Sequence, residues 1–152
     1  MVDRDLLLTK VGAVRKHLDR AQRKCDTDLP SFLNDLDLQE SVLFNIQLAI
    51  QRCIDIAAHI VSEEGLGVPG STSEMFYLLE ESNFLGTQLT EKMVKAVGFR
   101  NLIVHAYTKL DLVQAYEIAR KDIMDLHDFL KTIIQKCDVV PPSPSSKPNT
   151  DP

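Results

Sequence analysis

Apolar residues recur every three or four positions over most of this chain, and that spacing constrains its fold more than any other feature. Leu7, Val11, Val14 and Leu18 follow one another at i, i+4, i+7 and i+11, which places them along one side of an α-helix. The pattern predicts a first helix over residues 3–24 with a basic opposite face, and it breaks at residues 27–30.

A longer apolar stretch, residues 37–62, forms the centre of the pattern. Its apolar residues cover more than one helical face, which indicates a central helix that packs against several neighbours. Asp37 and Glu40, three positions apart, predict a capping box at its start. A loop rich in Gly, Pro and Ser follows at 65–73, and further helices are predicted over 73–83, 88–106 and 111–136. No segment is typical of a strand, so we expect an all-α bundle of about five helices.

The end of the chain has a different composition. Five of the seven prolines lie in the last fifteen residues, DVVPPSPSSKPNTDP, where proline removes backbone donors and little apolar surface is available to bury. We therefore expect one helical domain over residues 1–137 and a disordered Pro/Ser-rich tail over 138–152.

Charge and cysteine content limit the function. The formal net charge of −5 argues against a protein coated in nucleic acid, although it leaves room for a local basic cleft. Three widely spaced cysteines without a Cys/His cluster predict neither a disulfide framework nor a zinc site. No stretch approaches the length of a membrane span, and a reduced cytoplasm fits best.

One window, RNLIVHAY at residues 100–107, gathers groups that bind or transfer protons. On an ideal helix, Tyr107 lies about 20° from Arg100, while Asn101 and His105 lie about 100° and 140° away. Arg100 and His105 therefore do not face each other on an unbroken helix. Their cooperation requires either a helix that loosens near His105 or a second copy of the site.

The neighbourhood of this window favours an anion. Between Lys92 and Lys109 there are four Lys and Arg residues and no Asp or Glu. Gly98 lies inside the helical pattern at a cost of up to about 1 kcal/mol relative to Ala, which suggests close approach of another backbone. His transfers protons near neutral pH and Arg binds phosphate oxygens, so together they suit cleavage of an RNA phosphodiester without a metal. From spacing alone, a polar rim on a packed helix remains the alternative.

The stretch MVKAVGFRNLIVHAYTKLD, residues 93–111, resembles the HEPN family, and within it the HepT-type (DUF86-like) toxins. Their R-x4-H-x-Y hallmark is matched by Arg100, His105 and Tyr107. The resemblance covers roughly residues 3–136 and includes FNIQLAIQRCIDIAAHIV and the loop before the motif. It implies a HEPN-like bundle that forms a homodimer, with the motifs of both protomers lining a shared cleft.

The same resemblance implies a function and a partner. It predicts the toxin of a type VII toxin–antitoxin system, a metal-independent endoribonuclease that cleaves cellular RNA, either tRNA or mRNA. Arg100 would stabilise phosphate and His105 would act as general acid or base. A minimal nucleotidyltransferase antitoxin of the MntA type would neutralise the toxin by transferring AMP from ATP to Tyr107. The chain itself would need no cofactor and no metal.

Two further residues are expected to support this site. Asp55 lies in an apolar stretch, where a carboxylate needs a partner, and we expect it to hold Arg100 or His105. Asn101 is expected to bind phosphate or to orient His105. The competing hypothesis is a non-catalytic helical subunit that docks a nucleotidyltransferase or a nucleotide. A regulator with vestigial activity is a third possibility.

Overall fold

The structure is a computed structural model, and it describes residues 2–137. In this range every regular element is a helix, which confirms the expected all-α class. The tail predicted for residues 138–152 lies outside the described residues. No helix within 2–137 combines the length and apolar character that crossing a membrane requires.

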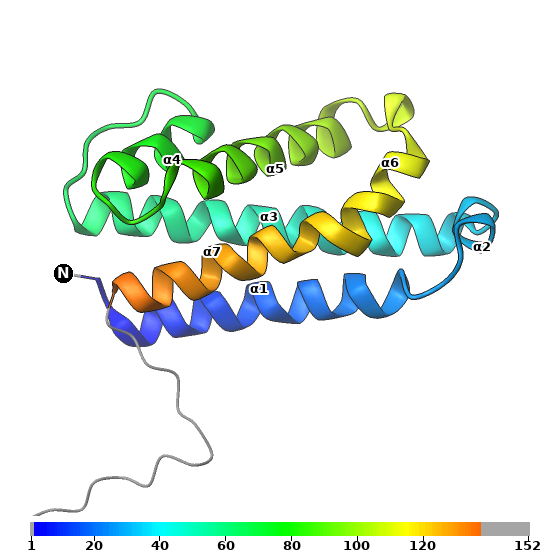
Figure 1. Cartoon of the computed structure of the whole chain (residues 1–152), viewed down its shortest axis with the longest axis horizontal. Helices are drawn as coiled ribbons and strands as arrows, with labels where there is room; N and C mark the ends of the chain where they lie inside the picture. The colour runs from blue at the N-terminus through cyan, green and yellow to red at the C-terminus, as the bar shows by residue number, and fades with distance from the viewer. Residues whose placement is uncertain (1, 138–152) are drawn as a thin grey trace, which may run out of the picture.

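Four long helical segments lie roughly alongside one another and form the body of the molecule (Figure 1). The helices are α1 (Arg4–Lys24), α2 (Leu29–Leu33), α3 (Leu36–Glu63), α4 (Thr72–Glu81), α5 (Thr87–His105), α6 (Leu112–Glu117) and α7 (Ile123–Lys136). The short helices α2 and α4 lie near opposite ends of α3 (Figure 1). The predicted helices are all present, and α2 is an addition that begins within the predicted break.

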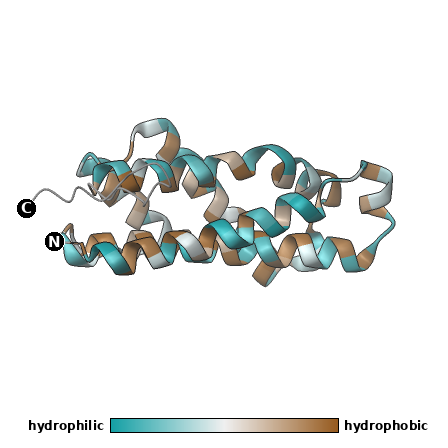
Figure 2. Ribbon diagram, turned by 90° about the horizontal axis from the view of Figure 1, so that it is seen from below, coloured by the Kyte–Doolittle hydropathy of each residue, from teal (hydrophilic) through white to brown (hydrophobic). Residues whose placement is uncertain are grey.

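The core confirms the periodicity of the sequence. Leu7, Val11, Val14 and Leu18 of α1 are fully buried. Helix α3 buries residues on several sides, as expected of a central helix, and packs against α1, α2, α4, α5 and α7. Hydrophobic and hydrophilic stretches alternate along the helices (Figure 2). Apolar burial between these helices is the main contribution to stability.

The start of α3 corrects one prediction. Asp35, and not Asp37, is the N-cap, because its Oδ1 accepts a hydrogen bond from the backbone N–H of Leu38 at 3.0 Å. Asp37 and Glu40 therefore do not form the capping box, and both side chains are exposed on the first turns of the helix. Ser71 caps α4, because its Oγ accepts a hydrogen bond from the backbone N–H of Glu74 at 3.2 Å.

The last predicted helix, 111–136, is one helical run with a local change of winding. Helix α6 passes into a π-helical turn, Ile118–Asp122, and then into α7. Asp111 caps the run by accepting from the N–H groups of Val113 and Gln114. A π turn adds one residue per turn, which reorients α7 along α1 and α3.

Candidate functional site

Helix α5 presents the RNLIVHAY window at the end that α4 leaves uncovered. Along its first half, Thr90, Met93 and Val97 are buried, and Tyr77 Oη of α4 donates to Glu91 Oε1 at 3.2 Å. Helix α4 reaches only this first half (Figure 1). Beyond it, the helix remains α-helical as far as His105, so the part of the window up to His105 lies on a regular helix with one side open to solvent.

Arg100 occupies a half-buried position on α5. Its Nε atom is buried and has no hydrogen-bond partner among the described residues. A buried guanidinium N–H without a partner is costly, and because this atom is closed off from solvent, an acceptor from outside the chain reaches it only if the Arg100 side chain moves. The position suits the phosphate-binding role expected of Arg100.

Asn101 and His105 lie on the exposed side of the same helix, together with Val104, which is 45% exposed. They are four positions apart and therefore neighbours on the helix surface. No hydrogen bond joins either of them to Arg100 within the described residues. Since α5 does not loosen before His105, the first of the two ways to bring Arg100 and His105 together does not occur within one chain.

The chain leaves the helix immediately after His105. Ala106 adopts φ −143° and ψ 42°, and residues Tyr107–Lys109 form a 3₁₀ turn. This change carries Tyr107 away from the continued path of α5 and toward the first turns of α3. Tyr107 is 41% exposed as a whole residue, so part of it faces solvent.

Tyr107 forms one wall of a groove of about 610 Å³ against α3. The other residues that line this groove are Asp37, Glu40, Ser41, Leu43, Phe44, Gln47 and Ile103. Partial burial raises the pKa of Tyr107 above the ordinary value for tyrosine, and the negative charge of Glu40 raises it further. Both effects favour the protonated phenol over the phenolate.

The sequence analysis did not anticipate this groove. Asp37, Glu40, Phe44 and Gln47 follow one another at three- or four-residue steps, so they lie on one stripe of α3. Helix α3 is apolar on several of its other sides. The sequence signal of the groove is therefore a polar stripe on this helix that contains one phenylalanine.

Asp55 lies on α3 in a half-buried position. Its Oδ1 accepts a weak hydrogen bond from Gln51 Nε2 at 3.4 Å. The ion pairs among the described residues do not include Asp55 with Arg100 or His105. Within one chain, the structure therefore does not bring together the pair expected from the sequence.

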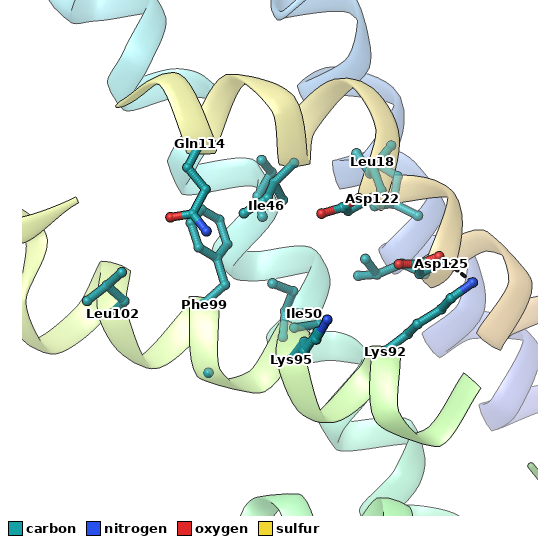
Figure 3. Close-up of a pocket in the computed structure, with 15 residues that line it drawn as sticks. Leu18, Ile46, Ile50, Lys92, Lys95, Phe99, Leu102, Gln114, Asp122 and Asp125 are labelled. Atoms are coloured by element: carbon teal, nitrogen blue, oxygen red, sulfur yellow. Dashed lines mark ion pairs between the residues drawn. The ribbon is translucent and has the colours of Figure 1, made fainter. Parts of the chain in front are cut away.

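A second hollow, of about 570 Å³, lies between α5 and the run from α6 to α7 (Figure 3). Ile46, Ile50 and Phe99 give it an apolar floor. At its edge the ammonium of Lys92 lies 3.6 Å from the carboxylate of Asp125, and this ion pair links α5 to α7 (Figure 3). Two of the basic residues in the acid-free window, Lys92 and Lys95, thus border this hollow, whereas Arg100 and Lys109 do not line it.

Gly98 also lines this hollow, and it is exposed. Apart from its chain neighbours and the backbone of its own helix within four residues, a Cβ built on Gly98 would meet no described atom within 4 Å. The close backbone approach expected at this position is therefore absent within one chain.

Comparison with known proteins places this helical bundle in a known group. A family model described as "Ribonuclease HepT-like" matches residues 14–133. The mRNA nuclease HepT of Shewanella oneidensis is 33% identical over 129 residues, which cover 85% of this chain and 96% of the relative. The tRNA nuclease HepT of Aphanizomenon flos-aquae is 26% identical over 111 residues, which cover 73% of this chain and 76% of the relative.

The fold itself is also similar to a solved structure. A tri-AMPylated Shewanella oneidensis HEPN toxin in complex with MNT antitoxin superposes with a TM-score of 0.82 at 32% sequence identity. The match covers 88% of this chain and 99% of that one. The similarity thus extends over nearly all of the residues that the structure describes.

Proposed function

This chain belongs to the HepT-like family of HEPN toxins, and from this premise we propose that it is a metal-independent endoribonuclease, the toxin of a type VII toxin–antitoxin pair. Its substrate is cellular RNA, and its relatives include one nuclease of mRNA and one of tRNA. The observation that carries the proposal is the end of α5, where a half-buried Arg without an ion-pair partner among the described residues and an exposed His lie on one regular helix.

In the proposed reaction, the 2′-oxygen of one ribose attacks the adjacent phosphorus and the 5′-oxygen leaves. His105 takes the proton of the 2′-hydroxyl or returns a proton to the leaving oxygen. Arg100 stabilises the negative charge that develops on the non-bridging oxygens. The products are a 2′,3′-cyclic phosphate and a free 5′-hydroxyl, so no metal-bound water is required.

The positions of Arg100 and His105 support a site built from two copies of the chain. They lie about 140° apart around a helix that stays regular through His105, so one small phosphate group cannot readily touch both in one protomer. A homodimer in which Arg100 of one copy meets His105 of the other satisfies this geometry. The exposed side of α5 then becomes one wall of a cleft between protomers, with Asn101 and Asp55 in supporting roles.

Regulation is proposed to act through Tyr107. An MntA-type nucleotidyltransferase partner transfers AMP from ATP to the phenolic oxygen, with release of pyrophosphate. Tyr107 lies two residues after His105 and is 41% exposed as a whole residue, so the transferase can reach it. The attached AMP adds bulk and negative charge beside the Arg100 and His105 positions, and it thereby excludes RNA.

The nuclease proposal is tested with purified protein, tRNA and mRNA in the presence of EDTA. The parent is expected to release fragments that end in 2′,3′-cyclic phosphate, whereas Arg100→Ala and His105→Ala are expected to lose at least a hundredfold in rate. Arg20→Ala, an exposed arginine on α1, is the matched control and should cleave like the parent. Intact RNA in a stable complex with the parent would instead support the non-catalytic binding subunit.

The regulatory proposal has a separate readout. After incubation with a cognate transferase and ATP, mass spectrometry should find AMP on the peptide that contains Tyr107, and Tyr107→Phe should remain unmodified. Modification confined to Tyr77 or Tyr116 would contradict the assignment.

A further inference from the structure

The groove between Tyr107 and α3 is a wide, open hollow whose volume is comparable to that of small-ligand sites. Its volume of about 610 Å³ falls within the range of about 300–1,000 Å³ that is typical of such sites. It begins at Tyr107, the last residue of the R-x4-H-x-Y motif, and extends along the first turns of α3. It includes Ile103 near the end of α5, whereas Arg100 and His105 do not line it.

Two exposed aromatic rings border this groove. Phe44 is 57% exposed and Tyr107 is 41% exposed. Among the phenylalanines of the described residues, only Phe44 is exposed. In proteins that bind single-stranded RNA, exposed aromatic rings commonly serve as platforms on which bases stack.

The groove is lined by two carboxylates, Asp37 and Glu40, which accept hydrogen bonds. Glu40 and Asp37 are exposed carboxylates, and neither takes part in an ion pair or hydrogen bond among the residues that the structure describes. Asp37 lies in the first turn of α3, where the helix dipole favours a negative charge. Glu40 lies beyond the first turn of α3, so the helix dipole stabilises its negative charge less than that of Asp37.

Carboxylates beside aromatic rings select one part of a nucleotide over another. They repel phosphate, and they accept hydrogen bonds from the exocyclic amino groups of bases. The groove therefore suits a base, while the positive charge of Arg100, a half-buried residue of α5, suits the phosphate. A nucleotide bound here would therefore place its base toward α3 and its phosphate toward Arg100, with Tyr107 between them.

We propose that this groove is a nucleobase site, which takes the amino-bearing base of the nucleotide next to the scissile phosphate, with the ring on Phe44 and Tyr107 and the amino group on Glu40. The inference rests on the proposed ribonuclease function and deepens it, because it assigns substrate preference to residues on α3. The adenine of an AMP attached to Tyr107 has the same chemistry, so it occupies the same groove and acts as a tethered competitor of RNA.

The cleavage arm of the test uses short RNAs that differ only in the nucleotide beside the cleaved bond. The parent should prefer A or C over U, and Glu40→Gln should reduce this preference by about tenfold. Phe44→Ala should lower kcat/KM about tenfold for every base, because stacking is lost. Glu81→Gln and Met124→Ala, both exposed and away from the groove, are matched controls and should behave like the parent.

The binding arm does not depend on catalysis, so it separates failure of this inference from failure of the proposed function. With His105→Ala protein in EDTA, saturation-transfer NMR should show contact of the adenine protons of free AMP with the protein, and Phe44→Ala should abolish it. Unchanged base preference in Glu40→Gln, no adenine contact, or a change of oligomeric state in Phe44→Ala would each overturn the proposal.

The covalent arm distinguishes tethered from free nucleotide. When Tyr107 carries AMP, the adenine should be shielded, and a phosphodiesterase should remove AMP several-fold faster from Phe44→Ala than from the parent. Equal rates of removal would show that the attached adenine lies outside the groove.

Discussion

Tyr107 is partly exposed to solvent, and its surroundings favour the protonated form of its hydroxyl. The ring is partly exposed, yet burial and the Glu40 carboxylate both raise the pKa of its hydroxyl. A transferase that modifies this tyrosine must therefore remove the proton itself.

The charge of Glu40 can be removed without loss of volume. Glu40→Gln should lower the pKa of Tyr107, because a carboxylate disfavours the nearby phenolate. Burial is the larger cause, so the pKa should stay above the ordinary value. NMR titration of the ¹³Cζ resonance, assigned with Tyr107→Phe, measures this shift. Glu81→Gln should leave the resonance unchanged, and a raised pKa in Glu40→Gln would contradict the explanation.

Arg100 is a half-buried arginine whose guanidinium has no carboxylate partner among the described residues. Its side chain is half-buried, and its Nε has no acceptor within the described residues. A structural arginine at such a place would be expected to have a carboxylate partner. The absence of one in the described chain is consistent with a partner supplied by substrate.

At the scale of elements, the start of α3 decides which residues face the groove. Asp35→Ala should lower the free energy of unfolding by about 1 kcal/mol, because the cap to the N–H of Leu38 is lost. Asp37→Ala should cost less, since Asp37 contributes only its charge near the helix N-terminus. Urea unfolding of the two variants measures the difference, and a larger loss in Asp37→Ala would restore the capping box.

The sequence predicted the helices well because apolar periodicity reports burial directly. The stripe from Leu7 to Leu18 and the many-sided segment around Ile50 are buried as expected. The short helix α2 was missed because its five residues are too few for a periodic pattern. The start of α3 was misplaced because Asp35 and Asp37 both suit a cap, and only the backbone geometry distinguishes them.

The site was predicted less completely. The window from Arg100 to Tyr107 is visible as a pattern, and the structure places it at an open helix end. The groove with Glu40 and Phe44 could not be foreseen, because it depends on where the chain turns after Ala106. That turn brings residues more than sixty positions apart to one surface, which no local pattern records.

Gly98 offers a test of how α5 is surrounded. Gly98→Ala should raise the free energy of unfolding by up to about 1 kcal/mol, because a helix favours Ala and, apart from its chain neighbours and the nearby backbone of its own helix, no described atom lies within 4 Å of the new Cβ. Gly12→Ala on α1, which has equally open space, is the matched control. A loss of stability in Gly98→Ala alone would show that another backbone packs against α5 at this point.

At the scale of the whole molecule, one chain carries all the proposed site residues but does not bring them together. Arg100 is half-buried on one side of α5, His105 is exposed on another, and Tyr107 turns toward α3. The packing of α3 against most of the other helices sets where these positions lie relative to one another. Assembly of two copies is the simplest way to bring an arginine and a histidine to one phosphate.

The most direct test is RNA cleavage by a mixed dimer of Arg100→Ala and His105→Ala protomers, purified through two different tags. If each site takes its arginine from one copy and its histidine from the other, the mixed dimer keeps one intact site of two. It should then cleave RNA at about half the rate of the parent, while both variant homodimers are inactive. A mixed dimer as inactive as the homodimers, or a His105→Ala homodimer as active as the parent, would contradict the account.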